Sequence, residues 1–144
     1  MAESKSGGCL CGAVRFTATP ANDDVGACHC SICRRWSAGP FMVRDCGTSL
    51  KIEDASKAGV YRSSEWAERG FCKTCGTTLY YRLIEKDMYF VSAEAFDDVK
   101  TLAFTSQVFI DEKPAYYYFA NKTHNMTGAE VFALFAPGGD EARG

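Results

Sequence analysis

The chain has 144 residues, a length that lets one domain bury a hydrophobic core, so residues 1–144 are predicted to form a single domain. Apolar residues make up 47% and charged residues 24% of the composition, which excludes the highly charged, weakly hydrophobic chains that stay disordered. The formal net charge of −2 argues against a basic nucleic-acid-binding surface.

Short apolar segments separated by turn residues predict a chain built mainly of β-strands. Alternation of apolar and polar residues predicts the first strand at 13–18, after the Gly7–Gly8 break, and a turn follows at 20–24. Residues 34–37 have the length of one helical turn. Further strands are predicted at 40–43, 50–52, 60–62, 78–83, 88–92 and 108–110, with a last candidate at 116–119.

A longer helix is predicted only near the C-terminus, at 128–135. There Val131, Leu134 and Phe135 recur at the i, i+3, i+4 spacing of one helix face. Because many short strands occur without a strand–helix–strand rhythm, the pattern favours a mainly β, mostly antiparallel fold.

The sequence contains no recognisable targeting or membrane segment. Residues 1–8 lack the apolar core of a signal peptide, and no apolar run approaches a membrane-spanning length. A cytoplasmic location without membrane association is therefore expected. In a reducing cytosol, eight cysteines at close spacings favour metal binding over disulfide bonds.

Two closely spaced cysteine pairs predict a four-thiolate zinc site. Cys72 and Cys75 form a C-x-x-C motif, Cys9 and Cys11 form a C-x-C motif, and a glycine follows each pair. In structural zinc sites each pair lies on a tight turn, which the glycine makes possible. We therefore expect all four cysteines to hold one Zn²⁺. A redox C-x-x-C is disfavoured because its usual βαβ context is missing.

A second cluster, Cys28, Cys30 and Cys33, supplies three thiols within a short segment. Three protein ligands with an open fourth position are typical of catalytic zinc, so two Zn²⁺ per chain are predicted. His29 and Cys46 are alternative fourth ligands. His29 would tend to point away from a metal held by both its neighbours, and Cys46 has no paired cysteine and is expected to be a buried apolar residue.

Zinc that carries three thiolates is a weak Lewis acid, which suits thiol chemistry better than water activation. Such a metal lowers the pKa of an incoming thiol and presents it as the nucleophilic thiolate. An anionic thiol would need nearby positive charge. The basic residues that could supply it are Arg34 and Arg35, directly after the cluster, together with Arg44, Arg62, Arg69 and Lys73.

Three segments carry a family resemblance, with the sequences GGCLCGAVRF (7–16), CHCSICR (28–34) and RGFCKTCGTTL (69–79). Together with a closing segment at 108–116, they make the chain resemble the glutathione-dependent formaldehyde-activating enzyme family, which includes centromere protein V. The resemblance runs from about residue 7 to residue 117 and includes seven cysteines in order.

The resemblance implies an Mss4-like, zinc-stapled β fold with a structural zinc on Cys9, Cys11, Cys72 and Cys75, and a catalytic zinc on Cys28, Cys30 and Cys33. It also implies a carbon–sulfur lyase activity, in which glutathione and formaldehyde condense to S-hydroxymethylglutathione. The expected partners are therefore a small thiol such as glutathione and an aldehyde. Gln107 stands where many relatives carry His, and Tyr116 where they carry Trp.

The competing hypothesis is a non-catalytic, zinc-stapled binding module, since the Mss4-like fold also serves in protein–protein interactions. In that case the second zinc would be structural, with His29 or Cys46 as its fourth ligand. The identity of that ligand separates the two hypotheses, while the sequence gives no indication of the oligomeric state.

Overall fold

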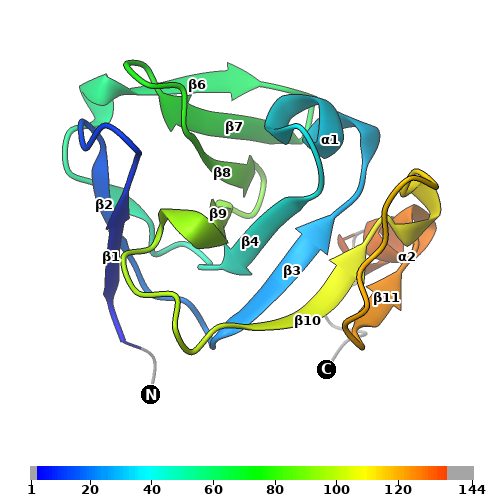
Figure 1. Cartoon of the computed structure of the whole chain (residues 1–144). Helices are drawn as coiled ribbons and strands as arrows, with labels where there is room; N and C mark the ends of the chain where they lie inside the picture. Colours follow the sequence, from blue (N-terminus) through cyan, green and yellow to red (C-terminus); the bar gives the residue numbers. More distant parts are fainter. Residues whose placement is uncertain (1–2, 136–144) are drawn as a thin grey trace. The chain divides into compact units, whose positions relative to one another are not determined.

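The computed structural model of the chain describes residues 3–135, which form eleven strands, two α-helices and three short 3₁₀-helices (Figure 1). This confirms the mainly β fold class. In chain order the elements are β1 (Lys5–Gly8), β2 (Arg15–Ala18), β3 (Asp24–Cys28), α1 (Ser31–Ser37), β4 (Phe41–Asp45), β5 (Lys51–Ile52), η1 (Ala55–Lys57), β6 (Ala58–Arg62), β7 (Ala67–Cys72), β8 (Thr78–Leu83), β9 (Met88–Ser92), η2 (Ala93–Ala95), β10 (Ala103–Val108), η3 (Ile110–Glu112), β11 (His124–Met126) and α2 (Gly128–Phe135).

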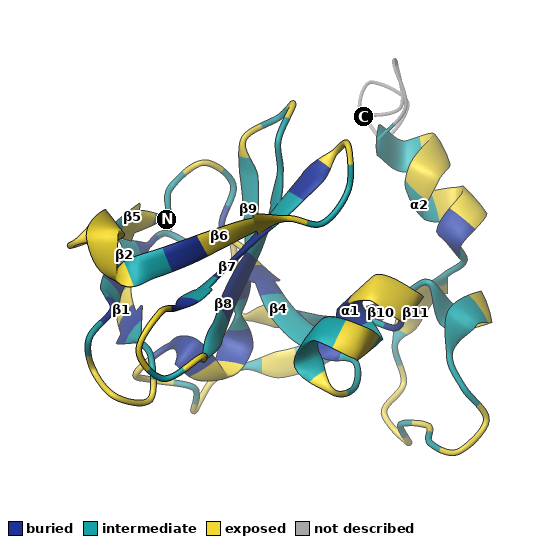
Figure 2. Ribbon diagram, turned by 90° about the horizontal axis from the view of Figure 1, so that it is seen from above, coloured by how far each residue is buried: buried dark blue, intermediate teal, exposed yellow. Residues whose placement is uncertain are grey.

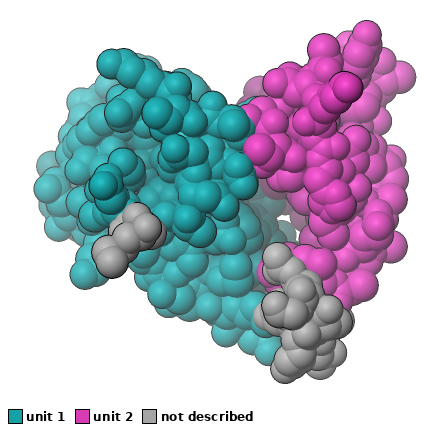
Figure 3. Space-filling model, turned by 90° about the horizontal axis from the view of Figure 1, so that it is seen from below, with its two compact units in different colours: residues 1–25, 42–103 teal, residues 26–41, 104–144 magenta. Residues whose placement is uncertain are grey.

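Contacts between residues divide the chain into two compact units, which Figure 3 draws in different colours. Unit 1 comprises Met1–Val25 and Met42–Ala103, and unit 2 comprises Gly26–Phe41 and Phe104–Gly144. Each unit contains one of the two cysteine clusters. The single domain expected from the chain length stays a prediction.

Unit 1 is built from antiparallel strands. Strands β1, β2 and β5 form a three-stranded sheet in that order. A second series runs β4-β9-β8-β7-β6, and each of its pairings is antiparallel. Figure 2 shows buried residues along β7 and β8. The largest members of the hydrophobic core are Val14, Phe16, Leu79, Tyr80, Val91 and Phe96.

Strand β7 was not predicted, because buried Gly70 and the charged residues beside it interrupt the apolar alternation. The ring of Tyr80 packs so closely on Gly70 that an added Cβ would come within 2.0 Å of it. The pairing of β7 with β8 shifts register between Gly70 and Phe71, directly before Cys72. This packing therefore determines where the second cysteine pair leaves the sheet.

Two arginines that were candidates for a surface basic patch are instead buried in unit 1. Arg44 and Arg69 are each 2% exposed. The Arg44 guanidinium lies 4.5 Å from the centre of the Phe96 ring and donates a hydrogen bond of 3.0 Å to the Asn22 carbonyl. Arg69 Nε donates to Ser63 Oγ at 3.1 Å. The patch hypothesis is therefore wrong for these two residues, because both are buried against internal partners.

Unit 2 contains β10, β11 and both α-helices. Strand β10 pairs in parallel with β11, an exception to the mostly antiparallel pattern. The predicted helix at 128–135 is confirmed as α2, and it begins with a reciprocal cap in which the Thr127 and Glu130 amides each donate to the other side chain. No helix between residues 3 and 135 combines the length and apolar character needed to cross a bilayer.

The strand predicted at 108–110 is wrong. Strand β10 ends at Val108, because Phe109 adopts a left-handed backbone with φ of 55° and a 3₁₀-helix, Ile110–Glu112, follows. The sequence pattern did not reveal β10, which precedes this segment, or its parallel neighbour β11, His124–Met126.

The candidate strand at 116–119 is also wrong, although its residues alternate in burial as a strand would. Tyr116 and Tyr118 are each 80% exposed. Tyr117, between these two residues, and Phe119, which follows them, are half-buried. Among the described residues this segment is not part of any strand. Its alternation of exposed and half-buried residues therefore comes only from the packing of every second side chain.

Gly70→Ala tests the close packing on β7. The added methyl group collides with the Tyr80 ring, so we expect a loss of about 1–3 kcal/mol in the free energy of unfolding. Thermal unfolding of the variant and of the wild-type protein measures this loss of stability. Lys51→Ala, at an exposed position of β5, is the control and should stay within about 0.5 kcal/mol. Equal stability of the two variants would show that the ring moves aside without cost.

Candidate metal centres

Four cysteine sulfurs converge in unit 1. Those of Cys9, Cys11, Cys72 and Cys75 all lie within 4.8 Å of one another. The Cys9 and Cys11 sulfurs are 3.6 Å apart, and the Cys11 and Cys72 sulfurs 3.8 Å apart. A tetrahedral zinc with Zn–S bonds of ~2.3 Å requires sulfur separations of roughly 3.8 Å. The structure thus brings the four predicted ligands together at distances that fit Zn²⁺.

Both cysteine turns of unit 1 end at a glycine in the left-handed region, as the motifs predict. Gly12 has φ of 83° and Gly76 has φ of 79°. The turn at Gly12 brings the Val14 amide to the Cys9 sulfur, to which it donates at 3.2 Å. Amide donors of this kind stabilise a thiolate and orient it toward a metal.

Thr77 connects the two turns. Its hydroxyl oxygen accepts a hydrogen bond from the Leu10 amide at 3.1 Å and lies 3.1 Å from the Cys75 sulfur. Since the amide occupies the oxygen as a donor, the hydroxyl proton is available to the sulfur. This contact lowers the pKa of the Cys75 thiol to about 5 and favours the thiolate that a metal ion needs.

The three remaining predicted ligands converge in unit 2. The sulfurs of Cys28, Cys30 and Cys33 lie within 4.8 Å of one another. Cys28 ends β3, Cys30 is the N-cap of α1, and Cys33 lies in the first turn of that helix. The Cys30 sulfur accepts from the Cys33 amide at 3.3 Å, as a serine or aspartate cap would. Because Cys30 caps it, α1 starts at Ser31 rather than at residue 34.

The crowding of these thiols resists their ionisation. Hydrogen bonds with the thiols of Cys30 and Cys33, and then burial, raise the pKa of Cys28 above its ordinary value. Three adjacent thiols can all become thiolates only if a cation neutralises them. A soft divalent ion such as Zn²⁺ fits this set of donors.

His29, between two of these cysteines, is fully buried and turned toward the interior of unit 2. Its Nε2 lies 2.7 Å from Gln107 Oε1, and its Nδ1 lies 2.8 Å from the Tyr117 hydroxyl. Burial lowers the pKa of His29 below its ordinary value, which disfavours the charged imidazolium. Because both ring nitrogens are engaged, the structure does not support His29 as the fourth ligand.

Cys46, the other alternative ligand, belongs to the hydrophobic core of unit 1 and is 2% exposed. Burial raises the pKa of its thiol to about 12. A neutral, buried thiol packs as a small apolar side chain, as the sequence indicated. It is absent from both cysteine groups found among residues 3–135.

Positive charge near the unit 2 cluster comes from Arg34 and Lys113. Arg34 Nε donates to the His29 carbonyl at 2.9 Å. The Lys113 ammonium donates to the Tyr117 carbonyl and lies 5.3 Å from the centre of the Tyr117 ring. After burial, the charges of Lys113 and Arg34 are the causes that further lower the pKa of His29. Arg34 was a predicted contributor, and Lys113 was not.

Sequence reasoning missed the contacts of His29. Tyr117 lies 88 residues after His29 in the chain, and Gln107 lies 78 residues after it. No motif spacing links such distant positions. The available signal was a buried histidine between two metal ligands, which requires hydrogen-bond partners from elsewhere.

The chain is similar to several known proteins. A family model described as glutathione-dependent formaldehyde-activating enzyme matches residues 4–112. A Schizosaccharomyces pombe protein named as an uncharacterized lyase is 42% identical over 126 residues, covering 87% of this chain and 92% of its own length. A Halomonas elongata protein provisionally named as a glutathione-dependent formaldehyde-activating enzyme is 31% identical over 83 residues, covering 51% of this chain and 53% of its own.

Among solved structures, the crystal structure of a Rhodobacter sphaeroides protein aligns with a TM-score of 0.58 at 25% sequence identity. The alignment covers 67% of this chain and 91% of that chain. The fold is therefore shared with a known structure.

Metal analysis tests the two clusters. About two Zn²⁺ per chain are expected after purification under reducing, chelator-free conditions, because each cluster supplies the thiolates for one ion. Cys46→Ala is the matched control, since this buried cysteine belongs to neither cluster, and it should retain both ions. One ion or none in the wild-type protein would contradict the two-site prediction.

The two clusters should differ in their effect on folding. Cys72→Ser removes a ligand that links segments 61 residues apart, so it should give insoluble or poorly folded protein. The three ligands of the unit 2 cluster come from one short segment, so a metal bound there joins no distant parts of the chain. After Cys30→Ser the β core should therefore persist while the second zinc is lost. Thermal unfolding and zinc content, measured side by side, make the comparison. Equally severe unfolding of both variants would assign a structural role to the second cluster too.

Proposed function

The chain belongs to the glutathione-dependent formaldehyde-activating enzyme family, and we propose that it is a lyase-type enzyme that forms and cleaves the bond between a thiol sulfur and an aldehyde carbon. The names of its relatives, a lyase and a formaldehyde-activating enzyme, support this reaction class. The observation that carries the proposal is the convergence of Cys28, Cys30 and Cys33 with no fourth cysteine, histidine or carboxylate grouped with them among the described residues.

The reaction joins a thiol to a carbonyl group: R–SH + O=CH₂ gives R–S–CH₂–OH. The sulfur lone pair forms the new bond to carbon, the carbonyl π pair moves onto oxygen, and the proton lost by sulfur ends on that oxygen. The reverse direction is the carbon–sulfur lyase reaction. Bound at the unit 2 cluster, Zn²⁺ would supply a soft Lewis acid that lowers the pKa of the thiol.

The protein's own residues would hold and shape this site. Cys28, Cys30 and Cys33 would bind the metal and leave one coordination position for the substrate thiol. Three thiolates would give the centre a net charge of −1, which weakens water activation and favours thiol exchange. Cys30 also caps α1, so the ligand geometry is tied to the start of a helix.

Charge near the cluster supports an anionic thiol as substrate. Arg34 and Lys113 both lie beside His29, next to two of the three ligands. Glutathione carries carboxylates that such cations attract, so glutathione with formaldehyde or a related small aldehyde is the substrate pair we expect. A cytoplasmic location, where thiols stay reduced, belongs to the same proposal.

The unit 1 cluster would have a different role. Cys9, Cys11, Cys72 and Cys75 provide four ligands and leave no open position, as in structural zinc sites. The binding-module hypothesis requires the second site to be closed as well. The hydrogen bonds of His29 and the core position of Cys46 do not favour that alternative.

Cobalt substitution tests whether the unit 2 site is open to a thiol. Adding glutathione to the Co²⁺-loaded protein should change the thiolate-to-metal absorption, because a new sulfur enters the coordination sphere. Cys30→Ser should lose this response. A spectrum that is indifferent to every thiol tried would favour the closed, structural alternative.

Turnover tests the reaction itself. The zinc-loaded protein should consume free formaldehyde in the presence of glutathione faster than the two react in buffer alone. Cys30→Ser should reduce the rate to the uncatalysed one, and Cys46→Ala should keep it. A zinc-loaded wild-type protein with no acceleration for any thiol and aldehyde pair would overturn the proposed function.

A further inference from the structure

A carboxylate from a distant segment of unit 2 holds the start of helix α1. Glu112 Oε1 accepts a hydrogen bond of 2.9 Å from the Ser31 amide, and the two residues lie 81 positions apart in the chain. Ser31 is the first residue of α1 and directly follows Cys30, the N-cap. The first amides of a helix have no partner within the helix. Glu112 therefore supplies from outside the partner that this amide requires.

This hydrogen bond defines the turn that carries two of the three thiols. The Cys30 sulfur accepts from the Cys33 amide at 3.3 Å, a contact within the turn. The Ser31 amide lies between these two cysteines in the chain and is bonded instead to Glu112. The conformation of the turn therefore depends on one contact made inside it and one made from outside.

The segment that carries Glu112 also holds the residue after the third thiol. The His29 amide, directly after Cys28, donates to the Val108 carbonyl at 3.1 Å. Val108 ends β10, and the 3₁₀-helix η3, which ends at Glu112, follows closely. The cysteine segment is thus held at two points by one other segment of the same unit.

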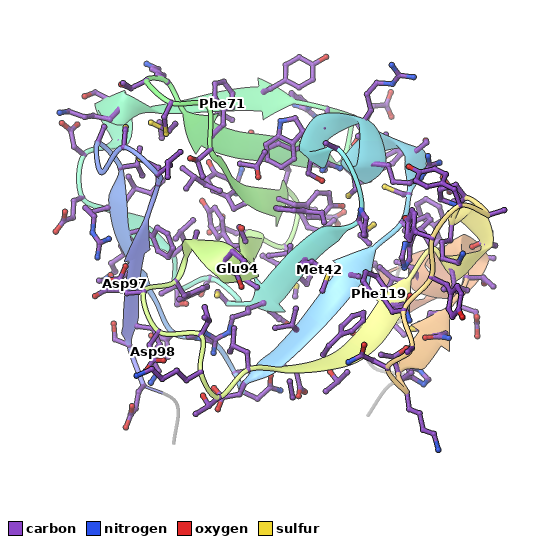
Figure 4. All side chains as sticks on the ribbon, viewed as in Figure 1. Met42, Phe71, Glu94, Asp97, Asp98 and Phe119 are labelled. Atoms are coloured by element: carbon purple, nitrogen blue, oxygen red, sulfur yellow. The ribbon has the colours of Figure 1, made fainter. Side chains whose placement is uncertain are left out.

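Helix η3 is itself fixed on both sides. An added Cβ on Gly128 would come within 2.7 Å of the Phe109 ring, so this ring packs directly on the start of α2. The Gly128 amide donates to Asp111 Oδ1 at 2.8 Å. Further along the chain, Phe119 packs edge-on against Phe104 of β10 at 4.9 Å, and Figure 4 labels Phe119 beside that strand. The support for the start of α1 is therefore anchored to the rest of unit 2.

A turn held in this way is arranged before a metal ion arrives. If the turn were free in the metal-free protein, metal binding would have to order it, and the lost conformational entropy would weaken the affinity. Groups that orient the ligands of a metal without touching the ion typically change metal affinity or activity roughly 10–100-fold when they are mutated. A site with three protein ligands depends on such groups, because it lacks a fourth ligand to hold its geometry.

We propose that Glu112 is a positioning residue of the unit 2 site, whose side-chain oxygen holds the Cys30–Cys33 turn in the conformation that binds the metal ion. Its carboxylate is not grouped with the three sulfurs among the described residues, so it acts through the Ser31 amide. The inference rests on the proposed function for the metal ion at this site, and adds to it the residue that arranges the ligands.

Glu112→Ala removes the acceptor and should weaken the binding of the second Zn²⁺ roughly 10-fold. Competition with a colorimetric chelator measures the affinity of each ion in the full-length protein, and Cys30→Ser shows which ion belongs to unit 2. Asp111→Ala is the matched control, because this neighbouring carboxylate holds the start of α2 instead, and both affinities should stay unchanged. Equal affinities in Glu112→Ala and the wild-type protein, or an equal loss in Asp111→Ala, would overturn the inference.

Glu112→Gln separates hydrogen bonding from charge, because it keeps an oxygen acceptor and removes the negative charge. This variant should bind the second Zn²⁺ with an affinity close to that of the wild-type protein. If Glu112 acted only by attracting the cation, Glu112→Gln would bind zinc as weakly as Glu112→Ala, and the positioning role would be refuted.

Ser31→Pro removes the donor of the same hydrogen bond. Proline is favoured at the first position of a helix, and Cys30 before it has φ of −63° and ψ of 155°, the extended conformation that a following proline requires. Ser31→Pro should weaken the second Zn²⁺ as much as Glu112→Ala does, and the two changes together should cause no further loss. Additive losses would show that Glu112 does not act through this amide.

The affinity measurements do not depend on turnover, so the two proposals can fail separately. A wild-type protein that binds two Zn²⁺ but accelerates no reaction of a thiol with an aldehyde overturns the proposed function, while the zinc affinities of the variants still decide the role of Glu112. A wild-type protein that is active, with an unchanged second affinity in Glu112→Ala, overturns the role of Glu112 alone. A wild-type protein that binds a single ion overturns both.

Discussion

Unit 1 depends on bringing four sulfur atoms from two distant segments within 4.8 Å of one another. The two segments start at Cys9 and at Cys72, and each must end its strand, turn tightly and present its sulfurs in the same place. The rest of unit 1 provides the conditions for this. Glycines at 12 and 76 allow the turns, Thr77 joins them, and the register shift after Gly70 sets where the second turn begins. A metal ion held by four thiolates would connect these two segments directly.

Unit 2 holds its cysteines by other means. Cys28, Cys30 and Cys33 come from one short segment and are arranged by the end of β3 and the start of α1. His29 is anchored in the interior by two hydrogen bonds, so the segment is fixed without a fourth ligand. A metal site assembled in this way can keep a coordination position free, because its geometry does not depend on closing the coordination sphere. That difference between the clusters agrees with a structural role for one and a chemical role for the other.

The basic residues of the two units also differ in what they contact. In unit 1, Arg44 and Arg69 are buried and hydrogen-bonded to internal partners, so they contribute to packing. In unit 2, Arg34 donates to the carbonyl of His29, between two cysteines of the cluster, and Lys113 donates to the carbonyl of Tyr117. The chemical type of a residue therefore did not determine its role, and its position in the fold did.

The sequence by itself determined the mainly β class, the closely spaced cysteine motifs and helix α2, because each depends on local spacing or periodicity. Strands 78–83 and 88–92 were predicted with their observed bounds for the same reason. Strand β7 was missed because a buried glycine and a buried arginine obscure its pattern, and 116–119 mimicked a strand through alternating burial alone. Only the tertiary structure decided the partners of His29, since they lie 78 and 88 residues away and no local pattern relates them. Local spacing fixes which residues can bind a metal, whereas the groups that orient them are chosen by packing between distant segments.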